Sequence, residues 1–269
     1  MKIARSFARP VGGVLPAVVL AAMLAAVLTG CVTTRSSHLS NGHAQADAAA
    51  DNVQLAMAYM QEGNLARAKE KLDRALKEDP SNPNVHSVYA LFYERINDQK
   101  KAEGEFREAL RLAPGDPAQL NFYGVYLCRQ HRVDEGVTKM LQVATNPLYR
   151  TPEAAYTNIG VCLRTAHRDD EAASAFRRAL AARPDFAEAA FQMADLELAH
   201  GRALEARERV EKFIKQFNST PDLLMVAVRA SRTLGDAQGI ARYTKILRAD
   251  FPSSEQARSL GAGPPANPG

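Results

Sequence analysis

From residue 49 onward, apolar residues recur every three or four positions, which places them along one face of a helix. These periodic segments come in pairs, and a proline follows the second segment of several pairs, as at Pro80, Pro114, Pro184 and Pro252. Proline disfavours helical backbone in the residue before it and so ends each pair. The pattern therefore predicts a series of antiparallel helix pairs.

The pairs recur with a nearly constant period. Pro80 and Pro114 are 34 residues apart, and the residue types upstream of each correspond, for example Ala68 with Ala102. Six units are predicted, and they begin near residues 49, 83, 117, 153, 187 and 221. One pair cannot bury its apolar face alone, so successive pairs must stack. The longest interval, 36 residues, lies between the third and fourth units, where the chain reads "ATNPLYRTPEA".

This pattern resembles the tetratricopeptide repeat. Small residues such as Ala68 and Ala75 stand where two helices approach closely, and Gly63 and Asn97 stand at turns that favour left-handed backbone. The resemblance implies an all-α fold, a right-handed α-solenoid of six tetratricopeptide (TPR) repeats over residues 49–254. It also implies that the first helix of each unit lines the inner surface of the solenoid.

Residues 1–30 predict a lipoprotein signal peptide. Lys2, Arg5 and Arg9 form a basic start, and residues 11–28 are apolar except for glycine and proline. A transmembrane helix is less favoured, because glycine and proline interrupt this run and no basic cluster follows it. The quartet "LTGC" that ends at Cys31 resembles the bacterial lipobox, in which the cysteine becomes the lipidated first residue. The alternative is a plain signal peptide with an incidental cysteine.

The lipobox resemblance implies a location. Val32, rather than aspartate, follows the cysteine, which resembles the default sorting of such lipoproteins to the outer membrane. We therefore expect an outer-membrane protein, anchored by lipid on Cys31, whose solenoid faces the periplasm. Residues 31–48 are small and polar and predict a flexible tether. Residues 255–269 predict a C-terminal cap followed by a disordered tail, because the end of the chain is rich in glycine and proline.

Charge and motifs narrow the function. The formal net charge is +4, but three of the 34 basic residues lie in the first thirty positions, which hold no acid, so the rest has 31 basic residues against 30 acidic ones. This balance argues against a nucleic-acid partner, which needs a basic patch. No phosphate-binding loop, HExxH or GxSxG motif is present. We expect no enzymatic activity, metal, cofactor or small-molecule substrate.

Two cysteines stand on first helices of neighbouring units. Cys128 falls in the third unit and Cys162 in the fourth. Disulfides persist in the oxidising periplasm, so one that links these units is a candidate. The alternative is a pair of buried free thiols, and only the distance between the two residues decides.

Helical phase predicts a binding groove. Positions two, five, nine and twelve of each first helix are expected to face inward. In the first three units the apolar candidates for a partner-binding groove are Val53, Met57, Met60, Leu91 and Val125. In the last unit the same positions include Asp222 and Arg229, so the groove is expected to become charged. An exposed apolar stripe suits an amphipathic helix or an extended peptide. The alternative is a stripe covered by the tether or by another helix.

The whole chain resembles one family more closely: the type IV pilus biogenesis and stability lipoproteins known as PilF or PilW. The lipobox, the tether and six repeats occur together, and "NFYGVYLCRQHRVDEG" and "YTNIGVCLRTAHRDDEA" are similar to that family's segments. The resemblance implies a pilotin. Such a protein binds the secretin subunit of the type IV pilus and promotes its localisation and multimerisation in the outer membrane. The alternative is a TPR scaffold lipoprotein of another envelope assembly, such as β-barrel insertion or a cell-wall enzyme complex.

Overall fold

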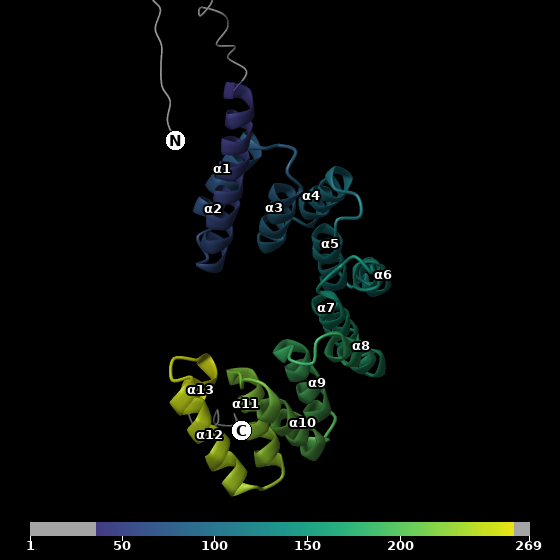
Figure 1. The fold of residues 1–269 in the computed structure, drawn as a ribbon, viewed down its shortest axis with the longest axis vertical. Helices are drawn as coiled ribbons and strands as arrows, with labels where there is room; N and C mark the ends of the chain where they lie inside the picture. Colours follow the sequence, from purple (N-terminus) through teal and green to yellow (C-terminus); the bar gives the residue numbers. More distant parts are fainter. Residues whose placement is uncertain (1–35, 261–269) are drawn as a thin grey trace, which may run out of the picture. The chain divides into compact units, whose positions relative to one another are not determined.

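In the computed structural model, which describes residues 36–260, the chain forms thirteen helices and no strand within that range (Figure 1). They are, in chain order, α1 (Ser36–Gln61), α2 (Leu65–Glu78), α3 (Pro83–Arg95), α4 (Gln99–Leu112), α5 (Pro117–Arg129), α6 (Val133–Ala144), α7 (Pro152–Thr165), α8 (Asp169–Ala182), α9 (Ala187–Ala199), α10 (Ala203–Gln216), α11 (Pro221–Thr233), α12 (Ala237–Asp250) and α13 (Glu255–Ser259). Residue 48 begins the compact unit that holds the helix pairs.

Tight turns join the two helices of each pair. The residue in left-handed backbone at these turns is glycine in three pairs and Asn97 in the second. In the third and fourth pairs it is histidine: His131 has a φ of 60° and His167 a φ of 58°. Left-handed backbone favours glycine and tolerates asparagine and histidine, so all six turns adopt one geometry with three residue types.

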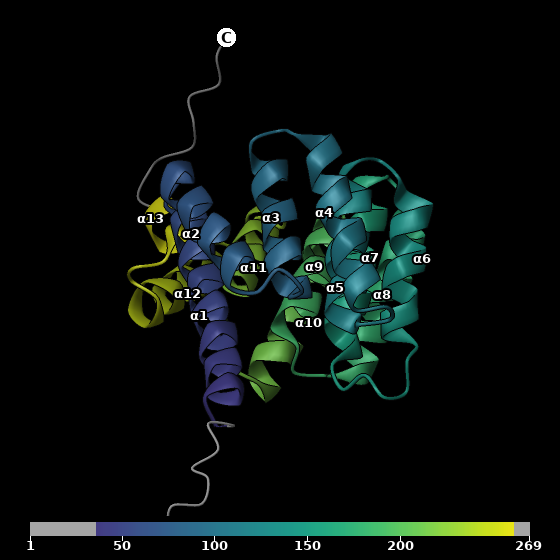
Figure 2. The same ribbon diagram turned by 90° about the horizontal axis from the view of Figure 1, so that it is seen from above.

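The first helices of successive pairs stack against each other. Cα atoms of α3 approach those of α5, and the same holds for α5 with α7, α7 with α9 and α9 with α11. Among α4, α6, α8, α10 and α12, no helix comes as near to the next. The first helices therefore lie on the inner side of the stack, and the second helices lie outside them (Figures 1 and 2). The described helices form an α-solenoid.

Small residues allow the two helices of a pair to approach. Ala68, Ala102, Ala172 and Ala206 occupy equivalent positions in second helices, and each is fully buried. Large side chains such as Phe106 fill the space between pairs. This alternation of small and large residues produces a continuous core along the stack, in the way expected for helical repeats.

The N-terminal boundary differs from the prediction. The tether predicted over residues 31–48 is wrong for residues 36–48, because α1 begins at Ser36 rather than near residue 49. Ala44, Ala46 and residues 48–50 are alanines, and alanine has the highest intrinsic helix propensity, so this segment continues the first helix towards its N-terminus.

The chain ends are described in part. α13 contacts α11 and α12, and its Ala257 is buried, so residues 255–260 cover the end of the last pair. The predicted signal peptide, Cys31 and residues 261–269 lie outside the described residues. Over residues 36–260, no helix has the length and apolar character needed to span a membrane.

Candidate protein-binding groove

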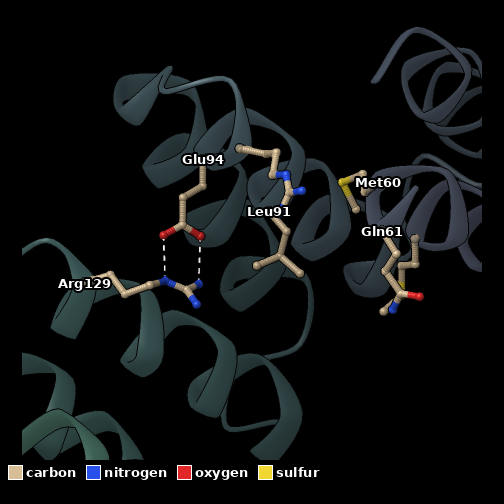
Figure 3. A pocket seen from close by; sticks show the side chains of 7 residues that line it. Met60, Gln61, Leu91, Glu94 and Arg129 are labelled. Atoms are coloured by element: carbon tan, nitrogen blue, oxygen red, sulfur yellow. Dashed lines mark hydrogen bonds and ion pairs between the residues drawn. The ribbon is translucent and has the colours of Figure 1, made fainter. Parts of the chain in front are cut away.

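A pocket of 360 Å³ opens between α1 and α3 on the inner side of the solenoid (Figure 3). We call it the methionine pocket, and it is lined by Met57, Met60, Gln61, Leu91, Glu94, Arg95 and Arg129. Met57 is 40% exposed, although it is a large apolar residue. Because methionine is flexible and polarizable, the pocket can adapt to apolar side chains of different shapes.

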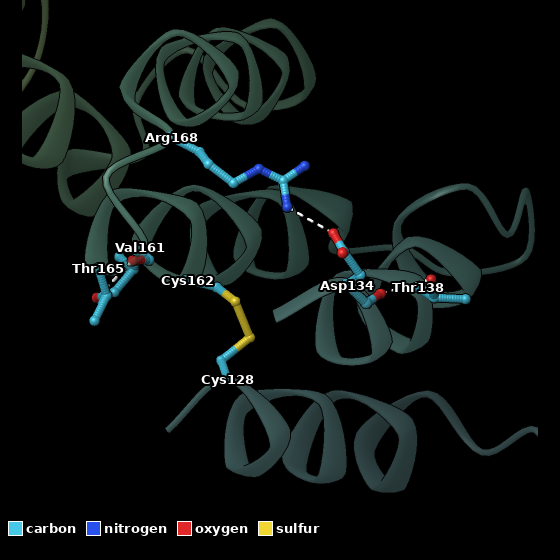
Figure 4. Close-up of a disulfide and its surroundings, with 7 residues drawn as sticks. All are labelled: Cys128, Asp134, Thr138, Val161, Cys162, Thr165 and Arg168. Carbon is cyan, nitrogen blue, oxygen red and sulfur yellow. Dashed lines mark hydrogen bonds and ion pairs between the residues drawn. A yellow bond between two sulfur atoms is a disulfide. The ribbon is translucent and has the colours of Figure 1, made fainter. Parts of the chain in front are cut away.

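A second pocket, of 160 Å³, opens between α5 and α7. We call it the disulfide pocket, and it is lined by Val125, Cys128, Arg129, Asn158, Val161, Cys162 and Thr165. The sulfur atoms of Cys128 and Cys162 are bonded at 1.98 Å, and their Cα atoms are 5.6 Å apart (Figure 4). The disulfide joins the first helices of the third and fourth units and forms part of the pocket wall. Val161 is 38% exposed there.

Arg129 belongs to both pockets. Its Nε and Nη2 atoms each donate a hydrogen bond of 2.7 Å to the carboxylate of Glu94 on α3 (Figure 3). This bidentate pair links the second unit to the third and leaves Nη1 of the guanidinium outside the pair. The methionine pocket and the disulfide pocket therefore form one groove with an arginine between its two apolar parts.

The residue at position nine of each unit shows how the inner surface changes along the solenoid. Position nine of the first four units holds Met57, Leu91, Val125 and Val161, all apolar. In the last two units it holds Asp195 and Arg229. Position nine of the inner surface is thus apolar along α1 to α7 and charged along α9 and α11.

At the charged end of the inner surface, Asp195 pairs with two arginines. The carboxylate of Asp195 accepts a hydrogen bond of 2.7 Å from Arg164 of the preceding unit and another of 2.7 Å from Arg229 of the following unit. Burial opposes ionisation of Asp195, but these two bonds outweigh that penalty and hold its pKa below the usual value. These paired groups hold neighbouring units together.

Four of the five residues predicted for the groove line one of the two pockets, and the fifth is buried in the core. Met57, Met60 and Leu91 line the methionine pocket, and Val125 lines the disulfide pocket. The prediction for Val53 is wrong: it is only 8% exposed and packs in the core formed by α1, α2 and α3. The buried face of α1 includes Ala49, Val53 and Ala56, and this 3.6-residue spacing turns position five away from the groove.

Val161, Glu94 and Arg129 are among the groove residues that sequence reasoning missed. Val161 was recoverable, because the 36-residue interval before the fourth unit places it at position nine. Glu94 and Arg129 occupy the ends of α3 and α5, where charged residues are commonly solvated, so no signal in the sequence distinguished their cross-unit pair.

A stack of helix pairs with an apolar groove along its first helices defines the class: a helical-repeat protein. The tetratricopeptide repeat family matches residues 53–117, 124–187 and 157–221. The chain is 28% identical over 233 residues to the type IV pilus assembly protein PilF of Pseudomonas aeruginosa, covering 86% of this chain and 92% of that protein.

Two solved structures agree in fold and family. PilW, described as a widely conserved type IV pilus biogenesis factor, is 30% identical with a TM-score of 0.60, over 79% of this chain and 97% of PilW. The structure of Pseudomonas aeruginosa PilF is 26% identical with a TM-score of 0.58, over 81% of this chain and 99% of PilF. The chain therefore belongs to the tetratricopeptide repeat family and, within it, to the PilF and PilW proteins of type IV pilus biogenesis.

Proposed function

We propose that this protein is a pilotin: a lipid-anchored scaffold that binds the secretin subunit of the type IV pilus and promotes its localisation and assembly in the outer membrane. The observation that carries the proposal is the apolar groove along α1 to α7 in a chain that is similar to PilF and PilW over most of its length. The groove supplies a binding surface, and the protein acts by binding without catalysis.

The lipid anchor gives the groove its effect. Acylated Cys31 holds the solenoid at the periplasmic face of the outer membrane, so a secretin subunit bound in the groove is confined to that surface. Confinement raises the local concentration of subunits, in the same way that a tether favours any second binding event. Ring assembly is then favoured at the membrane where the ring is needed.

The groove is tested by two matched substitutions on α1. Met57 and Leu55 are both apolar and similarly exposed, at 40% and 45%, but only Met57 lines the methionine pocket. We expect Met57→Glu to reduce binding of the purified secretin subunit at least about tenfold, since it removes an apolar contact and adds a carboxylate that must be desolvated when the partner binds. Leu55→Glu is expected to bind as the wild type does. Equal binding by both variants would show that the groove does not hold the secretin.

The anchor is tested in cells. In a strain that lacks this gene, we expect detergent-resistant secretin rings to be lost from the outer membrane. The wild-type gene should restore the rings, whereas Cys31→Ala should give a protein that fails to restore them there. Normal rings in all three strains would refute the pilotin function and favour a scaffold for another envelope assembly.

A further inference from the structure

We infer that the groove selects a secretin segment with two apolar anchors and an acidic residue between them, and this inference rests on the proposed function. One anchor occupies the methionine pocket and the other occupies the disulfide pocket. The acidic side chain meets Arg129, which lies between the two pockets.

The shape of the groove requires two anchors. The pockets measure 360 Å³ and 160 Å³, and both have an exposed apolar side chain, Met57 in the first and Val161 in the second. The methionine pocket lies between α1 and α3 and the disulfide pocket between α5 and α7, so about two helix spacings, or ~16–20 Å, separate them. A segment with apolar residues about five or six positions apart in an extended chain reaches both. About eleven to thirteen positions would be needed in a helix.

The charge of the groove selects an acidic segment. The residues that line the two pockets include Arg95 and Arg129 but only one acid, Glu94, so their formal charge is +1. The disulfide pocket itself contains no acidic residue among its lining side chains. A complementary segment is therefore apolar on one face and carries negative charge.

Arg129 supplies the specific contact. Glu94 occupies Nε and Nη2 of its guanidinium, and Nη1 has no hydrogen bond to any described residue. A carboxylate that binds there shares the Arg129 guanidinium with Glu94. The Glu94 carboxylate then opposes the bound segment by like charge while it orients the guanidinium.

The test uses overlapping twenty-residue peptides that cover the secretin subunit of the same organism. The full chain is purified in detergent, and affinity for the tightest peptide is measured by fluorescence anisotropy. We expect Val161→Glu to weaken binding at least about tenfold, and Leu204→Glu, a change at a similarly exposed leucine on α10, to leave it unchanged. Replacing the acidic residue of the peptide by its amide should weaken binding to the wild type but not to Arg129→Gln.

The pair of variants at Glu94 and Arg129 separates recognition from structure. If Arg129 binds the acidic residue of the peptide, Arg129→Gln weakens binding about five- to tenfold. Glu94→Gln then strengthens binding, because the Glu94 carboxylate no longer competes for the guanidinium. If the pair only holds α3 against α5, both variants weaken binding, and the inference is overturned. A normal affinity of Val161→Glu also overturns it while leaving the pilotin function intact. If no peptide binds but the purified secretin subunit does, only the inference is overturned; if the subunit does not bind either, the proposed function is refuted as well.

Discussion

At the scale of single residues, His86 of α3 has an environment that favours its protonated form. It is 8% exposed, its Nδ1 lies 2.7 Å from a carboxylate oxygen of Glu105, and its Nε2 lies 3.0 Å from the carbonyl oxygen of Pro80. Both neighbours accept hydrogen bonds, so both ring nitrogens must donate, which only the imidazolium can do. The bond to Glu105 is the largest cause that raises the pKa of His86, and it outweighs the cost of burial.

This geometry predicts a pH-dependent stability. A histidine with a raised pKa stabilises the fold fully below its unfolded pKa of about 6.5, and that contribution disappears as the pH rises through the higher folded-state pKa. At pH 5.5, we expect His86→Gln to lower the free energy of unfolding by about 1.5–3 kcal/mol in urea titrations, the range for hydrogen bonds to charged groups. The deficit should shrink at pH 9.

A second histidine supplies the control for that experiment. His200 pairs with Asp169 at 2.8 Å, but both side chains are substantially exposed, at 39% and 31%. Exposed pairs contribute little, so His200→Gln should change stability by under about 1 kcal/mol at either pH. Equal pH profiles for the two variants would contradict the role of His86.

Two helical glycines give a matched test of packing. A Cβ at Gly136 of α6 would lie 2.6 Å from the carbonyl oxygen of Gly124 and 2.6 Å from Sγ of Cys128, so Gly136→Ala should destabilise the fold by about 1–3 kcal/mol. A Cβ at Gly104 of α4 would meet nothing within 4 Å, so Gly104→Ala should stabilise it by about 0.5–1 kcal/mol. Urea unfolding of both variants measures this, and the opposite order would refute the close approach of α5 and α6.

At the scale of elements, the sequence predicted most of the helices because their ends have local chemical signals. α3, α5, α7 and α11 each begin with a proline at the first helical position, and Asn82, Asp116 and Thr220 cap three of them through side-chain hydrogen bonds. The start of α1 had no such signal, since alanine-rich helix and small-residue linker look alike in composition. The prediction for Val53 assumed that position five faces inward in every first helix. On α1 this position instead packs against α2 and α3.

The disulfide between α5 and α7 should contribute to stability through the unfolded state. It closes a loop between residues 34 positions apart, and a loop of this size corresponds to about 3–4 kcal/mol in the chain-entropy account. We expect the Cys128→Ala, Cys162→Ala double variant to unfold at a lower urea concentration than the oxidised wild type. Reductant should destabilise the wild type and leave the double variant unchanged. An unchanged midpoint in the double variant would show that the bridge adds no stability.

At the scale of the whole molecule, the proposed binding groove and the C-terminal cap lie in different units of the solenoid. The apolar groove occupies the first helices of units one to four, and the charged network of Asp195 and Arg229 occupies units five and six. At the end of the stack, α13 covers the last pair: Leu260 packs beside the core of α11 and α12, and Gln256 donates a 2.6 Å hydrogen bond to Asp222. In a solenoid each unit contacts only its neighbours, so a disturbance at this end should remain there.

Removal of the cap tests that separation. A chain that ends at residue 254 loses α13 and exposes the apolar surface of α11 and α12, so we expect amide hydrogen exchange in these two helices to accelerate at least about tenfold. Exchange in α3 to α6 should stay within about twofold of the wild type, because stability in such stacks is a sum of nearest-neighbour terms. A chain that ends at residue 260 keeps α13 and serves as the control. Affinity for the secretin peptide should be unchanged in both, since the groove lies in units one to four. Loss of affinity in the shorter chain alone would mean that the six units respond as one cooperative body, and that the groove depends on the far end of the solenoid.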